Sequence, residues 1–358
     1  RHAMMAVFGI LAAFGQAPFS LVFLGFAGFV GAFRAFVSLS GRRQAFVAGL
    51  GFGAGYFALS LHWIVEPFLV DLARHGWMAP FALVLMALGM ALFWGSAFAL
   101  AYPRGRAMLV VTLTGAELLR AYVFGGFPWA MPSYALVDGV AGQGAAWLGP
   151  HGLNLVFFAS AAAISGVRLN RLVAGMGALF LVLGLWPMPA PDDPEPGRPV
   201  VRLVQPNVPQ HQKWDPEFMP LSFDRALRLT RDGGQRPDLI VWPETSIPAP
   251  LGRSERSRAV IAEAAGDVPV LAGIMRFDGL RIYNSAVVLG SSGEPQQIYD
   301  KHHLVPFGEY VPLGDLLGRF GIHGLAAREG GGFSAGPGPR LLDLGALGNA
   351  LLLICYEA

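Results

Sequence analysis

The stretch Leu239-Ile240-Val241-Trp242-Pro243-Glu244-Thr245 decides the fold of the polar half of this chain. Its run of apolar residues predicts a short strand that is buried on both faces. Pro243 has no N–H to give to a strand ladder, so the strand must end there. Glu244 therefore follows directly from the end of a buried strand. Because ligands and chemistry gather at the carboxyl ends of strands in open α/β sheets, we expect this carboxylate to lie in a site.

Two further segments carry chemically useful side chains. They are Tyr299-Asp300-Lys301-His302-His303-Leu304-Val305-Pro306-Phe307-Gly308-Glu309-Tyr310 and Leu353-Ile354-Cys355-Tyr356-Glu357. A thiol at a strand end becomes a good nucleophile once a base takes its proton. A nearby ammonium stabilises both the thiolate and the oxyanion of a tetrahedral intermediate. Each residue alone also fits a structural role, but glutamate, lysine and cysteine in this order within one domain are far more specific.

The pattern around these segments predicts an α/β domain over residues 200–358. We expect strands at 200–205, 239–242, 268–274, 282–289, 296–299 and 350–354. We expect helices at 216–231, with Asp215 as N-cap and Pro216 at the first helical position, and at 254–265. The last strand delivers Cys355 at its carboxyl end. Residues 188–199 are rich in proline and acidic residues, which indicates a linker.

Residues 1–187 predict a membrane domain of about seven helices. Of the 26 basic and 24 acidic residues in the chain, only 14 lie in residues 1–188. Apolar spans are expected near 3–17, 19–37, 44–64, 78–101, 107–123, 151–167 and 171–187. Arginines concentrate in the loops after the second, fourth and sixth spans, and positively charged loops stay in the cytoplasm. This distribution places the N-terminus inside and residues 200–358 on the outer side.

Charged and aromatic residues mark the end of this membrane half. Glu117 and Arg120 lie on one face of the fifth span and can pair. The stretch 125–151 is rich in aromatic residues and glycine and too broken for a span. The sequence leaves two interpretations open. The pair and the aromatic belt are structural, or together they form a lateral doorway for lipid.

The order of Glu244, Lys301 and Cys355 within these motifs resembles the nitrilase, or carbon–nitrogen hydrolase, superfamily. Combined with the membrane half, the chain resembles the apolipoprotein N-acyltransferases, the membrane-bound members of that superfamily. The resemblance implies an α-β-β-α sandwich for the second domain. It implies Glu244 as general base, Lys301 as oxyanion stabiliser and Cys355 as nucleophile.

The resemblance extends to supporting residues. Glu309 corresponds to a second glutamate that orients the lysine or assists proton transfer. Tyr356 and Glu357 correspond to residues that shape the pocket. Trp214, at the end of the segment 204–214, corresponds to an aromatic residue near the substrate entrance. Members of this family extend beyond the nucleophile, so we expect the catalytic domain to be incomplete in this chain.

The implied reaction moves a fatty acyl chain from a phospholipid, usually phosphatidylethanolamine, to the thiol and then to an amine. That amine is the N-terminus of the diacylglyceryl-cysteine of a bacterial apolipoprotein. The implied protein is a monomer in the inner membrane, with its catalytic domain in the periplasm and no cofactor. Two alternatives stay open: a membrane-tethered carbon–nitrogen hydrolase, and a transporter with an extracytoplasmic binding domain.

Composition argues against two other classes of function. The net charge is +2, and no run of basic residues indicates nucleic-acid binding. His302 and His303 are adjacent, so their side chains diverge, and no further metal-ligand spacing accompanies them. We therefore expect no metal site.

Overall fold

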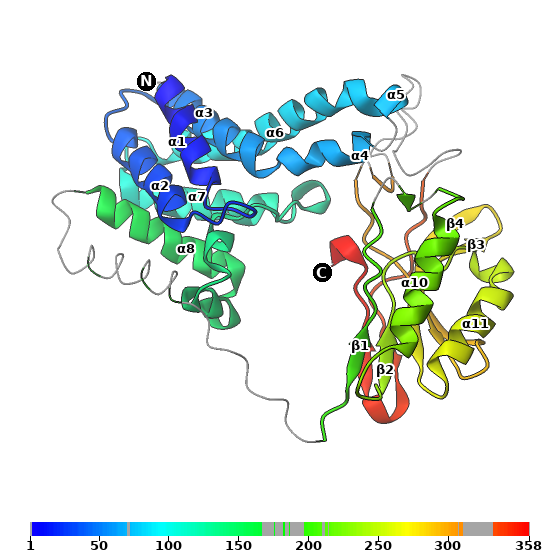
Figure 1. The fold of residues 1–358 in the computed structure, drawn as a ribbon. Helices are drawn as coiled ribbons and strands as arrows, with labels where there is room; N and C mark the ends of the chain where they lie inside the picture. The colour runs from blue at the N-terminus through cyan, green and yellow to red at the C-terminus, as the bar shows by residue number, and fades with distance from the viewer. Residues whose placement is uncertain are drawn as a thin grey trace. The chain divides into compact units, whose positions relative to one another are not determined.

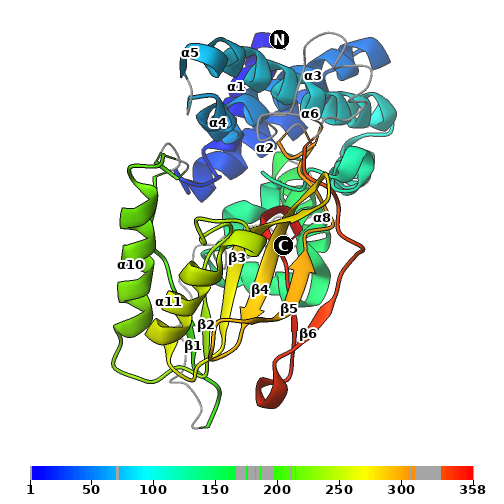
Figure 2. The same ribbon diagram turned by 90° about the vertical axis from the view of Figure 1, so that its right-hand side faces the viewer.

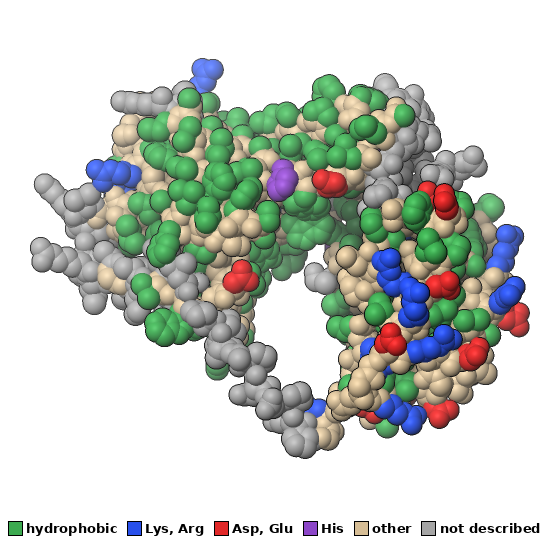
Figure 3. Space-filling view, viewed as in Figure 1, with side chains coloured by type: hydrophobic (Ala, Val, Ile, Leu, Met, Phe, Trp, Pro, Cys, Tyr) green, Lys and Arg blue, Asp and Glu red, His purple; other side chains and the backbone are tan. Residues whose placement is uncertain are grey.

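The computed structural model describes residues 2–69, 72–166, 197–209, 212–213, 215–306, 308–310 and 332–357, with Gly175, Val182 and Trp186. The chain divides into two compact units, Arg1–Pro191 and Asp192–Ala358. The division falls within the predicted linker 188–199. Charged side chains are sparse on the face of the first unit shown in Figure 3 and frequent on that of the second.

The first unit is a bundle of apolar helices (Figure 1). Its α-helices are α1 (His2–Ala13), α2 (Val22–Phe36), α3 (Arg42–Ser60), α4 (Glu66–Leu69), α5 (Leu72–His75), α6 (Ala79–Ala101), α7 (Arg106–Arg120) and α8 (Ala145–Ser165). Helices α1, α2, α3, α6, α7 and α8 lie at six of the predicted spans. The seventh, 171–187, lies almost entirely outside the described residues.

Among the described residues of this unit, two segments are long and apolar enough to cross a membrane, namely Gly76–Ala101 and Val140–Ser165. A third candidate is α3 together with His62–Leu69, which bends by 63° between its two parts. Helices α1 and α3 touch through their backbones, because a Cβ on Gly9 would lie 2.0 Å from the carbonyl oxygen of Phe52. Small residues that allow this contact are typical of helix packing in membranes.

Aromatic rings fill the centre of the bundle. Phe29 of α2 lies against Phe52 of α3, Trp94 of α6 and Phe157 of α8, with ring centroids 5.2–5.8 Å apart. All four side chains are buried. The three contacts of Phe29 are edge-to-face, which is a favoured geometry for aromatic pairs.

A buried ion pair joins this aromatic centre to the segment that follows α7. Arg120 is 1% exposed and Glu117 is fully buried, and Nη2 of the arginine lies 2.6 Å from Oε2 of the glutamate. Trp94 donates a hydrogen bond to the same carboxylate at 2.8 Å. The remaining donors of Arg120 bind the carbonyl oxygens of Phe127 and Trp129. The ion pair therefore has a structural role.

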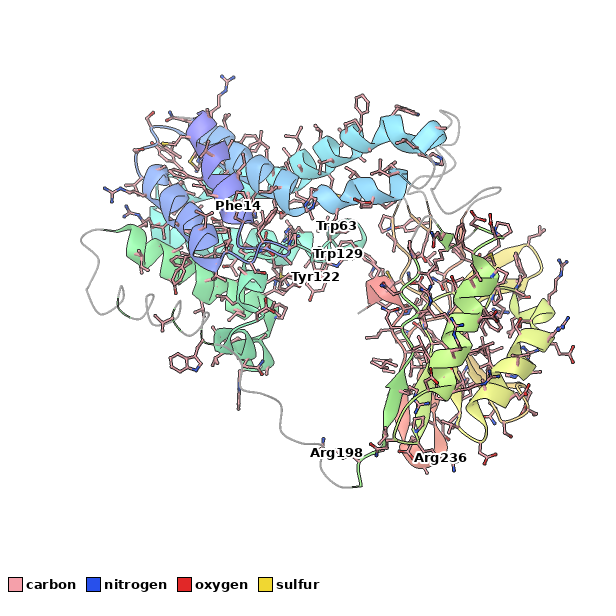
Figure 4. The ribbon with its side chains drawn as sticks, viewed as in Figure 1. Phe14, Trp63, Tyr122, Trp129, Arg198 and Arg236 are labelled. Carbon is pink, nitrogen blue, oxygen red and sulfur yellow. The ribbon has the colours of Figure 1, made fainter. Side chains whose placement is uncertain are left out.

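Further buried donors hold the same segment. Tyr56 of α3 donates to the carbonyl oxygen of Ala130, and Gln16 donates to that of Met131. Trp129 in turn packs against Trp63 with ring centroids 4.9 Å apart (Figure 4). The predicted broken stretch 125–151 follows the 3₁₀ helix Val123–Gly125. It contains two more 3₁₀ helices, Pro132–Leu136 and Val140–Gly144, and the first residues of α8. Side-chain donors satisfy the backbone carbonyl groups of Phe127, Trp129, Ala130 and Met131 in this stretch.

The second unit contains a five-stranded mixed sheet in the order β1-β2-β3-β4-β5 (Figure 2). Its strands are β1 (Val201–Leu203), β2 (Leu239–Val241), β3 (Val270–Asp278), β4 (Arg281–Leu289) and β5 (Pro295–Asp300). The pairs β1–β2 and β2–β3 are parallel, whereas β3–β4 and β4–β5 are antiparallel. A separate antiparallel pair consists of β6 (Leu341–Asp343) and β7 (Asn349–Leu351).

Different elements cover the two faces of this sheet (Figures 1 and 2). Helices α10 (Met219–Arg231) and α11 (Glu255–Ala265) pack on one face, where Ile240 and Val270 belong to the core. On the other face, Leu271 and Tyr299 pack with Leu342 of β6 and with Ile354. The predicted strands β1 to β5 are therefore present, each within a few residues of its expected ends.

Two local predictions are wrong. The first helix begins at Met219, not Pro216, and Asp215 accepts the N–H of Glu217 in the turn that precedes the helix. The strand expected at 350–354 ends at Leu351 and pairs with β6, not with the main sheet. Leu352 and Ile354 pack on that sheet, whereas Leu353 is exposed.

Replacing Arg120 with lysine is expected to destabilise the first unit. The ammonium retains the charge but cannot bind Glu117 and two carbonyl groups together, and disrupting a buried pair costs about 3–5 kcal/mol. Thermal unfolding of the detergent-solubilised protein measures the loss. The control is Arg104→Lys, because Arg104 is exposed and makes only a 3.4 Å bond to Leu100. Equal unfolding temperatures for the two variants would contradict the structural role.

Candidate active site

Glu244 lies just beyond the carboxyl end of β2, as its sequence position predicts. The segment carrying it packs directly on β3, because a Cβ on Gly273 would lie 2.4 Å from the Thr245 nitrogen and 2.6 Å from the Glu244 Cα. The carbonyl oxygen of Gly273 accepts hydrogen bonds from the N–H groups of Ser246 and Ile247. Gly273 thereby fixes the backbone that holds the carboxylate.

Lys301 follows the end of β5 and is almost completely buried, with 1% of its side chain exposed. Its Nζ lies 2.8 Å from Oε2 of Glu309. The backbone N–H of Val305 donates to the same oxygen at 2.9 Å. Glu309 engages one side of the ammonium, so Nζ keeps protons that it can donate to another acceptor. A buried ammonium with protons to donate is suited to stabilise a developing negative oxygen.

Asn284 of β4 joins the two carboxylates, and sequence reasoning did not identify it. Its Nδ2 donates to Oε1 of Glu244 at 2.6 Å and to Oε1 of Glu309 at 3.1 Å. Its backbone carbonyl accepts the N–H of Lys301 at 2.9 Å. The sequence offered one signal, an amide within a predicted strand, which must find hydrogen-bond partners wherever it is buried.

Cys355 opens a short 3₁₀ turn, Cys355–Glu357, and has a φ of 54°. A non-glycine residue in this left-handed region is uncommon and is found more often at functional sites. Cys355 is exposed, but the groups around its sulfur still desolvate the thiol and raise its pKa; the charge of Glu244 raises this pKa further, and that of Lys301 lowers it. The charge of Glu309 also raises it, so the charges of Glu244, Lys301 and Glu309 all act on the pKa of this thiol.

Glu357 fixes the turn that carries Cys355. Its Oε2 accepts the N–H of Ile354 at 2.9 Å, and its Oε1 accepts the N–H groups of His302 and His303 at 2.9 and 3.1 Å. Burial alone would raise the pKa of this carboxyl, but these hydrogen bonds and one from Tyr299 hold the pKa below its usual range. The carboxylate thus connects the backbone beside the thiol to the backbone beside Lys301.

The other predicted residues have less direct roles or lie elsewhere. The ring of Tyr356 packs against that of His303, with centroids 5.2 Å apart. Trp214 lies outside the described residues. Within the described ranges, no group of three or more His, Cys, Asp or Glu side chains could hold a metal ion.

Sequence comparison matches two families to this chain. Residues 8–163 match the family described as apolipoprotein N-acyltransferase N-terminal domain, and residues 201–358 match that described as carbon-nitrogen hydrolase. The predicted fold class, an apolar helical domain followed by a nitrilase-like α/β domain, is thereby confirmed. A crystal structure of an N-terminal amidase matches 30% of this chain and 28% of its own, at 22% identity and a TM-score of 0.25. That likeness supports no conclusion.

Curated relatives match along most of the chain. The apolipoprotein N-acyltransferase of Rhizobium etli (strain CIAT 652) is 36% identical over 87% of this chain and 64% of its own length. That of Caulobacter vibrioides is 35% identical over 99% of this chain and 72% of its own. That of Brucella melitensis biotype 1 is 35% identical over 100% and 74%. The chain therefore spans 64–74% of the length of these relatives. By these matches, the chain belongs to the apolipoprotein N-acyltransferase family.

Proposed function

We propose that the protein transfers a fatty acyl chain from a phospholipid to the N-terminal amine of a diacylglyceryl-modified apolipoprotein. The observation that carries this proposal is the joined set of Glu244, Asn284, Glu309 and Lys301, whose charges act on the Cys355 thiol. Family membership supplies the class of donor and acceptor. Phosphatidylethanolamine is the proposed donor and a monomer the proposed state. The proposed location is the inner membrane, with several spans and with the catalytic domain in the periplasm.

In the first half-reaction, Glu244 takes the proton of the Cys355 thiol. This base is needed because the raised pKa keeps the thiol protonated at neutral pH. The thiolate attacks the ester carbonyl carbon of the phospholipid, and the Lys301 ammonium stabilises the resulting oxyanion. The intermediate expels the lysophospholipid alkoxide, which takes the proton from Glu244. The products are an acyl thioester and a lysophospholipid.

In the second half-reaction, the amine of the acceptor attacks the thioester carbon. Glu244 accepts a proton from the attacking nitrogen, and Lys301 again stabilises the oxyanion. The intermediate expels the thiolate of Cys355, which regains a proton from Glu244. An amide and the free enzyme result. Water in place of the amine would give a hydrolase, which is the alternative that the acyl-enzyme experiment must distinguish.

Incubation of the purified full-length protein with phosphatidylethanolamine is expected to add one fatty acyl mass to Cys355. The bond should be cleaved by neutral hydroxylamine, as a thioester is. Mass spectrometry of the peptide that contains Cys355 measures the label, and Cys355→Ala is the control. Label that persists in the control variant would rule out this nucleophile. Rapid loss of label to water without an amine acceptor would favour the hydrolase.

Changes to Glu244 and Lys301 are expected to move the reactivity of the thiol in opposite directions. Glu244→Gln removes a charge that raises the thiol pKa, so iodoacetamide should alkylate Cys355 several-fold faster at neutral pH. Lys301→Met removes a charge that lowers this pKa, so alkylation should slow. Both variants should nevertheless lose acyl transfer. Arg236→Met, which removes an exposed cation (Figure 4), should leave alkylation unchanged. Changes in the same direction for both variants would contradict these roles.

Gly273→Ala is expected to displace the backbone of Glu244, because the new Cβ would overlap backbone atoms of residues 243–245. A misplacement of about 1 Å in a catalytic group can cost about 100-fold in rate. Acyl-enzyme formation measures the loss. The matched control is Gly252→Ala, since a Cβ at Gly252 meets nothing within 4 Å. Normal acylation by Gly273→Ala would show that the close approach does not position the base.

A further inference from the structure

Tyr299 and His302, on either side of Lys301 in the sequence, both contact Glu357. The Oη of Tyr299 lies 2.7 Å from Oε1 of Glu357 and 2.8 Å from Nδ1 of His302. The same Nδ1 lies 2.6 Å from Oε1 of Glu357. The three side chains therefore touch one another in a closed triangle, which we call the Glu357 brace. Neither Tyr299 nor His302 belongs to the catalytic set described above.

The direction of the protons in the Glu357 brace follows from its chemistry. The carboxylate of Glu357 has no proton to give, so the single hydroxyl proton of Tyr299 is donated to it. The oxygen of Tyr299 can then accept from His302, which requires a proton on Nδ1. With that proton, Nδ1 can donate to either Tyr299 or Glu357. His302 and Tyr299 thus both restrict where the carboxylate can lie.

The position of the Glu357 carboxylate matters because backbone groups on both sides of the site depend on it. Its Oε2 holds the N–H of Ile354, directly before the nucleophile. Its Oε1 holds the N–H groups of His302 and His303, directly after Lys301. The backbone at Cys355 has a positive φ and depends on surrounding contacts to keep it there. A rotation of this one carboxylate would release both the thiol and the ammonium.

The three side chains of the Glu357 brace differ in how far they are buried. The side chain of Glu357 is 1% exposed, and Tyr299 is 2% exposed. A buried hydroxyl or carboxylate that loses its partner cannot form a replacement hydrogen bond with water. Removing one member therefore leaves the other without a partner, at a cost in free energy. The side chain of His302 is 26% exposed, so a substitution there can be accommodated without disturbing the core.

We propose that Tyr299 and His302 are positioning residues of the acyl transfer, which act on Cys355 and Lys301 by fixing the Glu357 carboxylate. The proposal rests on the proposed function and extends it to two side chains that touch neither the thiol nor the ammonium. Their contribution is to orient the nucleophile for attack. Loss of either side chain should therefore lower the maximal rate of acylation more than the apparent affinity for the donor.

The test uses the full-length protein and compares Tyr299→Phe, His302→Gln and His302→Asn. An asparagine amide nitrogen can occupy the place of Nδ1, whereas a glutamine amide extends toward the place of Nε2. We expect Tyr299→Phe and His302→Gln to lower kcat for acyl-enzyme formation by about tenfold or more, as for a lost bond to a charged group. KM should stay nearly unchanged, and His302→Asn should retain most of the rate.

Two measurements separate positioning from loss of stability. Thermal unfolding identifies any variant that folds poorly. The rate of iodoacetamide alkylation at Cys355 reports the thiol without any lipid, so it tests the Glu357 brace even if the wild-type protein shows no acylation by phospholipid. The control is Tyr283→Phe, which removes a hydroxyl from the neighbouring strand β4 and leaves the brace intact.

The outcomes are distinct. Altered alkylation and a lower kcat in Tyr299→Phe and His302→Gln, with rescue by His302→Asn, support the proposal. Equal effects of the two His302 substitutions, or wild-type alkylation and kcat in Tyr299→Phe, would overturn it. Absence of acylation in the wild-type protein would overturn the proposed function alone, because the alkylation rates would still decide the role of the brace.

Discussion

Burial of the Lys301 ammonium imposes the arrangement of the whole site. A charge that is only 1% exposed requires an opposite charge beside it, since removing it from water is otherwise very costly. Glu309 supplies that charge, and its own position depends on the Val305 N–H and on Asn284. Asn284 also binds Glu244, so the counter-charge of the lysine and the proposed base share one amide.

The same physical rule acts in the first unit with a different result. Arg120 and Glu117 neutralise each other among apolar helices, and the spare donors of Arg120 satisfy carbonyl groups of the segment after α7. In hydrocarbon, an unpaired carbonyl group would be costly, so the irregular segment needs such donors. The pair therefore has a structural role, and the lateral doorway for lipid stays a prediction. Trp129, which the segment carries, has its backbone fixed by the pair.

Particular residues show how far sequence patterns extend. The run 239–242 predicted β2 because a buried strand is encoded by its own apolar residues. Helix α10 begins at Met219, after a turn at 216–218, because Asp215 and Pro216 suit such a turn as well as a helix start and periodicity cannot choose between them. The run 350–354 looked like one strand, but only its first part pairs with β6. Apolar character reports burial and does not report which neighbour buries a residue.

By itself, the sequence determined the two-part organisation, the mixed pattern of strands and helices, and the candidates Glu244, Lys301 and Cys355. These features depend on local composition and on which residue follows a strand. Only the tertiary structure revealed Asn284 between two carboxylates, Gly273 beneath Glu244, and the contact of Tyr299 and His302 with Glu357. The reason is physical: each of these contacts joins or packs together groups on different strands and turns. The distances between such groups are set by sheet register and packing, which no local pattern encodes.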